Sequence, residues 1–344
     1  MDKDVIDGDE SFVTVLMCVY NGEQFISGSV KSILAQTFKN LEFLIIDDGS
    51  TDRTVSIISS FDDQRIRLVH NEKNEGLIAS LNKGISLSKG NFIARMDADD
   101  IADEQRLSKQ LIFFKNNPGV GVCGSWMKII DTGNLYQLPL QHEEIKVAML
   151  FSNPMAHPTV MFNKKFIAKD QLYYDEEYKD AEDYELWPRL IFKTLFANIP
   201  EPLVGYRVHP QQVTQSRKEV MLATTQKIKL NFLKNFEIVP TEREKKVHLF
   251  LFDDFYDKND ISVSLDEADR WLYKLFEANK KLGILNDKLF NCLWQKKIFI
   301  SMVPAYNLRI WKLLASSLCF KYAAVEKKDK IKLFIKCLLN QKKN

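Results

Sequence analysis

Three aspartates at the end of a mostly apolar segment offer the clearest chemistry in the chain. Asp97, Asp99 and Asp100 follow the segment Phe92 to Met96, which reads as a buried strand. Carboxylates this close repel one another, and the repulsion raises their pKa values unless a cation compensates it. Mg²⁺ and Mn²⁺ prefer carboxylate oxygens and often share their ligand shell with substrate phosphates. The run predicts a divalent cation site, with an acidic turn or helix N-cap as the alternative.

Polar residues also follow two earlier apolar segments. Tyr20 and Asn21 come after the segment 12–19, and an aromatic ring with an amide there could hold a nucleobase. Asp48 comes after the segment 41–46, where a carboxylate can accept hydrogen bonds from a base or a ribose. The alternatives are a plain Asn-Gly turn at the first site, and an Asx turn with a helix cap at Ser50 or Thr51 at the second.

The elements that must position these residues alternate along the first hundred residues. We expect strands over 12–19, 41–46, 66–70 and 92–96, and helices over 25–36, 51–61 and 77–88. Apolar strands separated by helices indicate a parallel sheet covered on both faces. Ligands of such sheets bind beyond the carboxyl ends of the strands, so the polar clusters should converge on one cleft.

The remainder divides into two regions. Short strands are expected over 120–123, 127–130 and 159–162, then a helix over 180–196; amphipathic helices are expected over 219–282 and 285–340. Residues 1–216 contain 22 Lys/Arg and 31 Asp/Glu, whereas residues 217–344 contain 26 and 15. We therefore predict an N-terminal tail (1–10), a catalytic domain (11–216, halves 11–100 and 101–216) and a basic helical C-terminal region (217–344).

An ordered set of motifs resembles family 2 glycosyltransferases. The motifs are Val13–Asn21, Gln36-Thr37-Phe38, Ile45–Asp52, Asn74-Glu75-Gly76-Leu77, Met96–Asp100, Ala181–Trp187 and Tyr206-Arg207-Val208-His209. They cover roughly residues 11–215. The resemblance implies an α/β GT-A fold, a Rossmann-like and mostly parallel central sheet flanked by helices, here followed by an α-helical C-terminal region. It also implies an inverting, nucleotide-sugar-dependent hexosyltransferase.

The resemblance also implies roles for individual residues. It implies that the donor is bound by Tyr20, Asn21, Asp48, Gly76 and Asp97. Asp48 would contact a uracil-type base, and Tyr20 and Asn21 would lie against that base. Asp97 and Asp99 match the Asp-x-Asp motif that binds Mn²⁺ or Mg²⁺. His209 falls where some relatives place a residue near the metal and diphosphate. Asp183 matches the catalytic base.

The chemistry of sugar transfer fits these roles. A divalent cation neutralises charge on the departing diphosphate, and a carboxylate on the other side of the sugar removes the acceptor proton. Asp183 begins the predicted helix, whose dipole favours its ionised form, and the like charge of Glu182 raises its pKa towards working pH. The alternatives are N-terminal helix charge for Glu182 and Asp183, and a surface histidine for His209. His157 lies in a predicted loop that could line the acceptor site.

The sequence lacks motifs that are typical of two other classes of enzyme. A Gln-x-x-Arg-Trp motif of processive relatives is missing after Asp183, and so is the Gly-rich phosphate loop of a sugar nucleotidyltransferase. We expect a UDP-sugar donor and a glycan or lipid-linked acceptor of surface polysaccharide synthesis. The alternatives are a nucleotidyltransferase and a non-catalytic sugar-nucleotide binder.

We expect a cytoplasmic protein, either free in the cytoplasm or at the inner face of the membrane. Its five scattered cysteines indicate a reducing compartment, and no apolar stretch is long enough to span a bilayer. Residues 271–344 contain 16 Lys/Arg and 4 Asp/Glu, with three tryptophans, Trp271, Trp294 and Trp311. Two interpretations stay open for them: helices at the anionic inner face of the membrane, or a solvated face packed on the catalytic domain. No nucleic-acid recognition motif is present.

Overall fold

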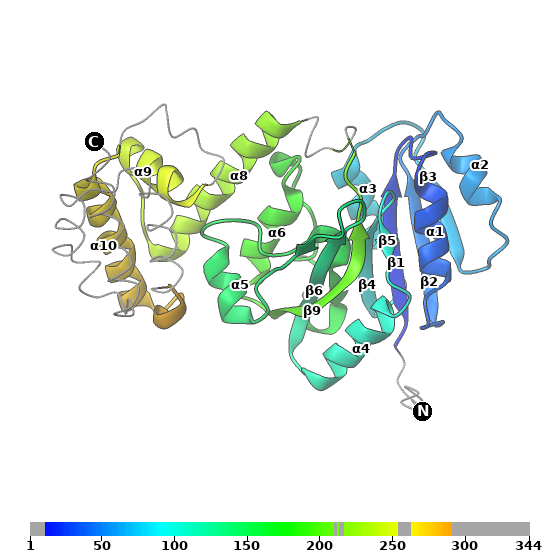
Figure 1. Cartoon of the computed structure of the whole chain (residues 1–344), viewed down its shortest axis with the longest axis horizontal. Coiled ribbons are helices and arrows are strands. Elements are labelled where there is room, and N and C mark those ends of the chain that lie inside the picture. The colour runs from blue at the N-terminus through cyan, green and yellow to red at the C-terminus, as the bar shows by residue number, and fades with distance from the viewer. Residues whose placement is uncertain (1–10, 210–211, 213–216, 254–262, 291–344) are drawn as a thin grey trace. The chain divides into compact units, whose positions relative to one another are not determined.

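A computed structural model describes residues 11–209, 212, 217–253 and 263–290 (Figure 1). The chain divides into two compact units. The first comprises the described residues up to 145 together with 154–224, and the second comprises 146–153 with the described residues from 225 onward. The first unit holds a sheet with helices, and the second is helical.

The first unit begins with four parallel strands. These are β1 (Val13–Val19), β2 (Leu41–Asp47), β3 (Ile66–His70) and β4 (Phe92–Asp97), in the spatial order β3-β2-β1-β4. β1 and β2 are almost entirely buried, as expected for strands covered on both faces. Their parallel pairing brings the residues that follow β1, β2 and β4 to the same edge of the sheet.

The sheet continues with strands of mixed direction. They are β5 (Ile101–Ala102), β6 (Val120–Ile129), β7 (Leu135–Tyr136), β8 (Met161–Asn163) and β9 (Leu195–Tyr206). β8 lies antiparallel to both β4 and β6, whereas β6 and β9 run parallel. Within the described residues the sheet contains nine strands, ordered β3-β2-β1-β4-β8-β6-β9-β5, with β7 paired to β6.

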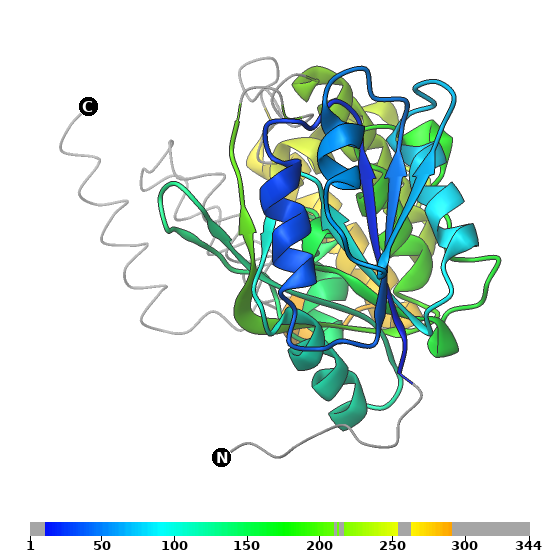
Figure 2. The same ribbon diagram turned by 90° about the vertical axis from the view of Figure 1, so that its right-hand side faces the viewer.

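Helices cover both faces of this sheet (Figures 1 and 2). The first face packs against α1 (Ile26–Leu34), α2 (Thr54–Ser59) and α4 (Arg106–Asn116) in one hydrophobic cluster. The second face carries α3 (Leu77–Leu87), where Gly84 lets the helix approach Leu16 closely, and α6 (Glu182–Leu190), where Trp187 packs against Phe162. The two-residue alternation of strand side chains supplies an apolar surface to each face.

Shorter elements complete the first unit. They are α5 (His142–Ala148), which runs into the second unit, and the 3₁₀ turns His157–Thr159, Lys164–Phe166 and Glu176–Tyr178.

The second unit is a set of packed helices. It contains most of α8 (Lys218–Phe232), a 3₁₀ turn (Leu233–Phe236), α9 (Glu242–Phe252) and α10 (Leu265–Leu282). Both α9 and α10 start with a capping box, and Arg243 of α9 pairs with Glu267 at the start of α10 at 2.6 Å. None of the helices in the described ranges is long and apolar enough to cross a bilayer. The helices expected beyond residue 290 lie outside the described residues.

The structure differs from the sequence predictions at several elements. The segments 120–123 and 127–130 form one continuous strand, β6. The helix expected over 180–196 ends at Leu190, and the sequence analysis missed β9 entirely. The helix expected over 51–61 is only Thr54–Ser59, and neither Ser50 nor Thr51 caps it. The last difference arises because the polar groups of residues 50–52 bind the loop after β1 instead.

Candidate active site

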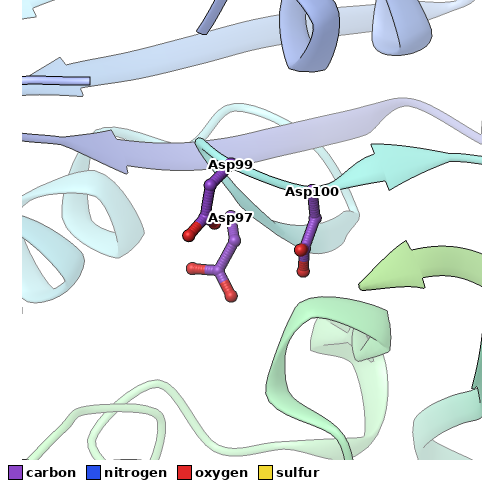
Figure 3. Close-up of side chains that lie close together, drawn as sticks. All are labelled: Asp97, Asp99 and Asp100. Atoms are coloured by element: carbon purple, nitrogen blue, oxygen red, sulfur yellow. The ribbon is translucent and has the colours of Figure 1, made fainter. Parts of the chain in front are cut away.

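The three aspartates of the opening motif share one small region at the end of β4. Asp97 is the last residue of β4, and Asp99 and Asp100 lie in the turn before β5. One carboxylate oxygen from each lies within 4.8 Å of the others, and Figure 3 shows the three side chains projecting from this turn. Oxygen donors at this spacing suit a hard divalent cation.

Asp100 is the most deeply enclosed of the three. It is fully buried, and its Oδ2 atom lacks a hydrogen-bond partner among the described residues. Burial, together with the charges of Asp97 and Asp99, raises the pKa of Asp100 to about 8. A cation in this cluster would offset the repulsion and supply the missing partner, so the residues present fit a metal.

The residues that follow β9 contact this acidic cluster. The backbone N–H of Arg207 donates to Asp100 Oδ1 at 2.9 Å, and Arg207 Nε donates to the carbonyl oxygen of Asp99 at 2.9 Å. His209 Nε2 lies 2.9 Å from Asp99 Oδ2. Phe25 supports both residues, with its ring 4.7 Å from the His209 ring and 4.8 Å from the Arg207 guanidinium. The structure thus brings Asp97, Asp99 and His209 together, as their predicted roles require.

A buried arginine, Arg95, forms an ion pair with the acidic cluster. Arg95 pairs with Asp97, and its carbonyl oxygen accepts a hydrogen bond from buried Arg106 at 2.7 Å. Burial raises the pKa of Asp97 and also that of Glu182, and the positive charge of Arg95 opposes the rise in both cases. The same guanidinium therefore acts on the acidic cluster and on the helix that carries Asp183.

The loops after β1 and β2 hold each other in place. Asn21 adopts a left-handed backbone with φ 49°, donates its N–H to Ser50 Oγ at 2.9 Å and accepts from the Thr51 N–H at 2.8 Å. The N–H of Glu23 donates to Asp52 at 3.0 Å. Tyr20 remains 48% exposed, so its ring is available to a ligand at this edge.

Asp48 anchors the next loop along the edge. Its buried carboxylate accepts from the side chain of Asn71 at 2.8 Å and from the backbone N–H groups of Glu75 and Gly76 at 2.9 Å each. Gly76 has φ 95°, which a residue with a side chain rarely adopts. Three donors leave about one acceptor position on this carboxylate for a base. The base contact of Asp48 stays a prediction.

Asp183 lies in the first turn of α6 and is partly exposed. The preceding residue, Glu182, is buried; burial and the charge of Asp183 raise the pKa of Glu182 to about 7. Nearby His157 is also buried, with Nε2 2.7 Å from the Tyr174 hydroxyl, and burial lowers the pKa of His157 well below its usual value. His157 is therefore enclosed, whereas Asp183 can meet a ligand.

Two residues at the cluster had no individual role in the sequence prediction. Asp100 belongs to the acidic run that predicted a cation site, but the assigned metal ligands were Asp97, Asp99 and His209. Arg207 was only one residue of a motif. Only the return of β9 reveals Arg207, because its contacts to Asp99 and Asp100 bridge more than a hundred positions.

Comparisons with known proteins identify the family of the chain. Residues 14–174 match the family described as Glycosyl transferase family 2. The chain is 33% identical over 307 residues to an uncharacterized glycosyltransferase of Haemophilus influenzae, covering 79% of this chain and 95% of the relative. It is 29% identical over 213 residues to the O-antigen biosynthesis glycosyltransferase WbnJ of Escherichia coli, covering 59% and 82%.

A solved structure shows the same fold. The crystal structure of S. aureus TarS 1-349 in complex with UDP-GlcNAc has a TM-score of 0.58 and 18% identity, covering 84% of this chain and 88% of that one. This likeness confirms the predicted GT-A fold. The family match, the long alignment with the H. influenzae relative and the fold agree, so the chain belongs to glycosyl transferase family 2 and is a glycosyltransferase.

Proposed function

We propose that the protein transfers a hexose-type sugar, with inversion, from a UDP-sugar to a glycan or lipid-linked acceptor in surface polysaccharide synthesis. The observation that carries the proposal is the meeting of Asp97, Asp99 and His209 beside the strand ends. The structural likeness to a UDP-GlcNAc complex and the sequence likeness to an O-antigen biosynthesis enzyme support the donor and acceptor classes.

The donor half of the site would work through fixed loops. Tyr20 offers an exposed ring for the base, and Asn21 and Asp48 hold the loops around it. Asp97, Asp99 and His209 would hold Mn²⁺ or Mg²⁺. When bound, the cation would supply Lewis-acid stabilisation of the charge on the departing diphosphate.

The acceptor half of the site would depend on Asp183. Its partly exposed carboxylate would accept the proton of the attacking acceptor hydroxyl. The dipole of α6 favours the ionised form of Asp183, whereas a charge on Glu182 disfavours it. These opposed effects would hold Asp183 ready as a base near neutral pH.

The test separates donor binding from chemistry. Calorimetry should show that Mn²⁺ tightens UDP binding by the wild-type chain, and that Asp99→Asn abolishes this gain. Asp183→Asn should keep UDP binding but lose sugar transfer by about 10²-fold or more. A UDP affinity that is the same with and without Mn²⁺ would refute the metal-dependent proposal. A wild-type rate of sugar transfer by Asp183→Asn would refute the assignment of Asp183 as the base.

Membrane contact of the basic C-terminal region is a separate part of the proposal. The positive charge of residues 271–344 would attract anionic lipid headgroups. The full-length chain should sediment with phosphatidylglycerol vesicles at low salt but not with phosphatidylcholine vesicles. Equal recovery with both would contradict membrane docking.

A further inference from the structure

The hairpin formed by β6 and β7 carries exposed apolar side chains that the proposed function leaves unused. Tyr136 pairs with Met127 and Leu135 pairs with Lys128, and a turn at Gly133 (φ 70°) connects the two strands. Leu135 is 50% exposed and Tyr136 is 49% exposed. Figure 2 shows the hairpin extending away from the body of the sheet.

The base of this hairpin is firmly held. Met127 is buried with Leu138 and Ala156, and Trp126 packs against this cluster. The indole N–H of Trp126 donates to the carbonyl oxygen of Leu138 at 2.9 Å. The backbone of Tyr136, directly opposite Met127, is therefore positioned by packed residues on the neighbouring strand.

The hairpin lies next to the strand that completes the acidic cluster. Beyond Met127, Ile129 pairs with Tyr206 of β9, and the Ile130 N–H donates to the Tyr206 carbonyl oxygen at 2.9 Å. The next residues of that strand end are Arg207 and His209, which contact the aspartates.

The helix that carries Asp183 lies close to the base of the hairpin. Met127 packs against Ala156, and the ring of the next residue, His157, lies 6.2 Å from the ring of Trp187 in α6. Partial burial and the negative charge of Asp183 raise the pKa of the Tyr136 hydroxyl. This interaction places Tyr136 within electrostatic reach of the assigned base, on the same hairpin that abuts the metal side of the site.

We propose that the Tyr136 side chain is the platform on which the acceptor saccharide rests while its hydroxyl faces Asp183. The inference rests on the proposed function and adds the residue that orients the acceptor. A sugar ring presents an apolar C–H face that packs well on an exposed aromatic ring, and the phenol can donate to or accept from a sugar hydroxyl. Orientation of this kind brings the reacting hydroxyl within reach of the base.

The test measures sugar binding directly. The full-length chain with UDP and Mg²⁺ would be titrated with methyl glycosides of glucose, galactose and N-acetylglucosamine, followed by saturation-transfer NMR. Tyr136→Ala should weaken binding of the preferred glycoside about 3- to 10-fold. Tyr136→Phe keeps the ring and should remain within about twofold of the wild-type affinity.

Leu135→Ala is the matched control, because consecutive strand residues point to opposite sides of the hairpin. It removes an equally exposed apolar side chain and should leave glycoside binding unchanged. Unchanged binding by Tyr136→Ala, or failure of all three glycosides to bind the wild-type chain, would overturn the inference.

Donor hydrolysis separates this inference from the proposed function. Release of UDP from UDP-sugars in water by the wild-type chain reports on the donor half of the site alone, because no acceptor saccharide takes part. If the wild-type chain neither hydrolyses a UDP-sugar nor binds UDP more tightly with Mn²⁺, the proposed function fails. If donor hydrolysis is intact and glycoside binding ignores Tyr136, only the platform fails.

Discussion

His209 Nε2 lies 2.9 Å from Asp99 Oδ2, although 110 positions separate the two residues in the chain. The contact exists because β9 runs beside β6 and ends at the same edge of the sheet as β4. It brings an imidazole nitrogen to a cluster of carboxylate oxygens, which widens the set of ligands available to a divalent cation.

His209→Ala should weaken Mn²⁺ binding about 10- to 100-fold, because the variant removes either a ligand or the group that orients Asp99. Isothermal titration with Mn²⁺ in the presence of UDP measures the effect. UDP binding without metal serves as the internal control and should not change. An unaltered Mn²⁺ affinity would place His209 outside the metal site.

Asp48→Asn should lower the free energy of unfolding by about 1–3 kcal/mol. The reason is that the backbone N–H groups of Glu75 and Gly76 would face an amide that offers one acceptor oxygen instead of two. Urea denaturation measures the change, and UDP affinity should fall as well if the base rests against this loop. Asp62→Asn, at an exposed aspartate, is the matched control and should be neutral.

The regular first half of the fold could be predicted from the sequence. The strands β1 to β4 are short apolar runs bounded by polar turns, and each lies within one or two residues of its expected range. The position of Asp97 and Asp99 at a strand end follows from the same pattern, because carboxylates are seldom buried without a partner and therefore gather where a buried strand ends.

The order of the strands in the second half of the sheet, and the strand β9, could not be predicted, since they depend on pairing between residues far apart in the chain. β9 contains Pro200 and Pro202, which normally argue against an internal strand, yet it pairs with β6 through shifts in register near Trp126. Without β9, the sequence gives no reason for Arg207 to meet Asp100. The sequence likewise could not show that the Asp48 carboxylate accepts hydrogen bonds from three groups of its own chain.

Glu182→Gln should leave the acidic limb of the kcat/KM profile below about pH 6 in place and remove a change in slope near pH 7. Catalysis by Asp183 requires its ionised form. Because the pKa of Glu182 is raised to about 7, Glu182 is uncharged on the acidic limb and gains a charge beside Asp183 only as the pH rises through about 7. The measurement is kcat/KM from pH 5 to 8, with Glu185→Gln in the same helix turn as control. An acidic limb displaced by about one pH unit would mean that Glu182 is already charged there.

His248 gives the helical unit its own pH dependence. The ring is fully buried, Nδ1 accepts from the Trp271 indole N–H at 3.3 Å, and burial with the charge of Lys229 lowers the pKa of His248 to about 3. Between about pH 6.5 and 3 the unfolded chain holds a proton on His248 that the folded chain does not, so stability falls as the pH falls. In this window the free energy of unfolding should drop by up to about 1 kcal/mol per pH unit because of this residue.

His248→Leu should flatten that slope while lowering stability at pH 7.5, because Trp271 loses its acceptor. Urea denaturation followed by tryptophan fluorescence at pH 7.5, 6.0 and 5.0 measures both effects. His70→Asn, at a side chain that is 51% exposed, is the control and should keep a slope close to that of the wild type. Parallel slopes for the wild-type chain and His248→Leu would mean that other groups, and not this buried imidazole, set the acid sensitivity of the helical unit.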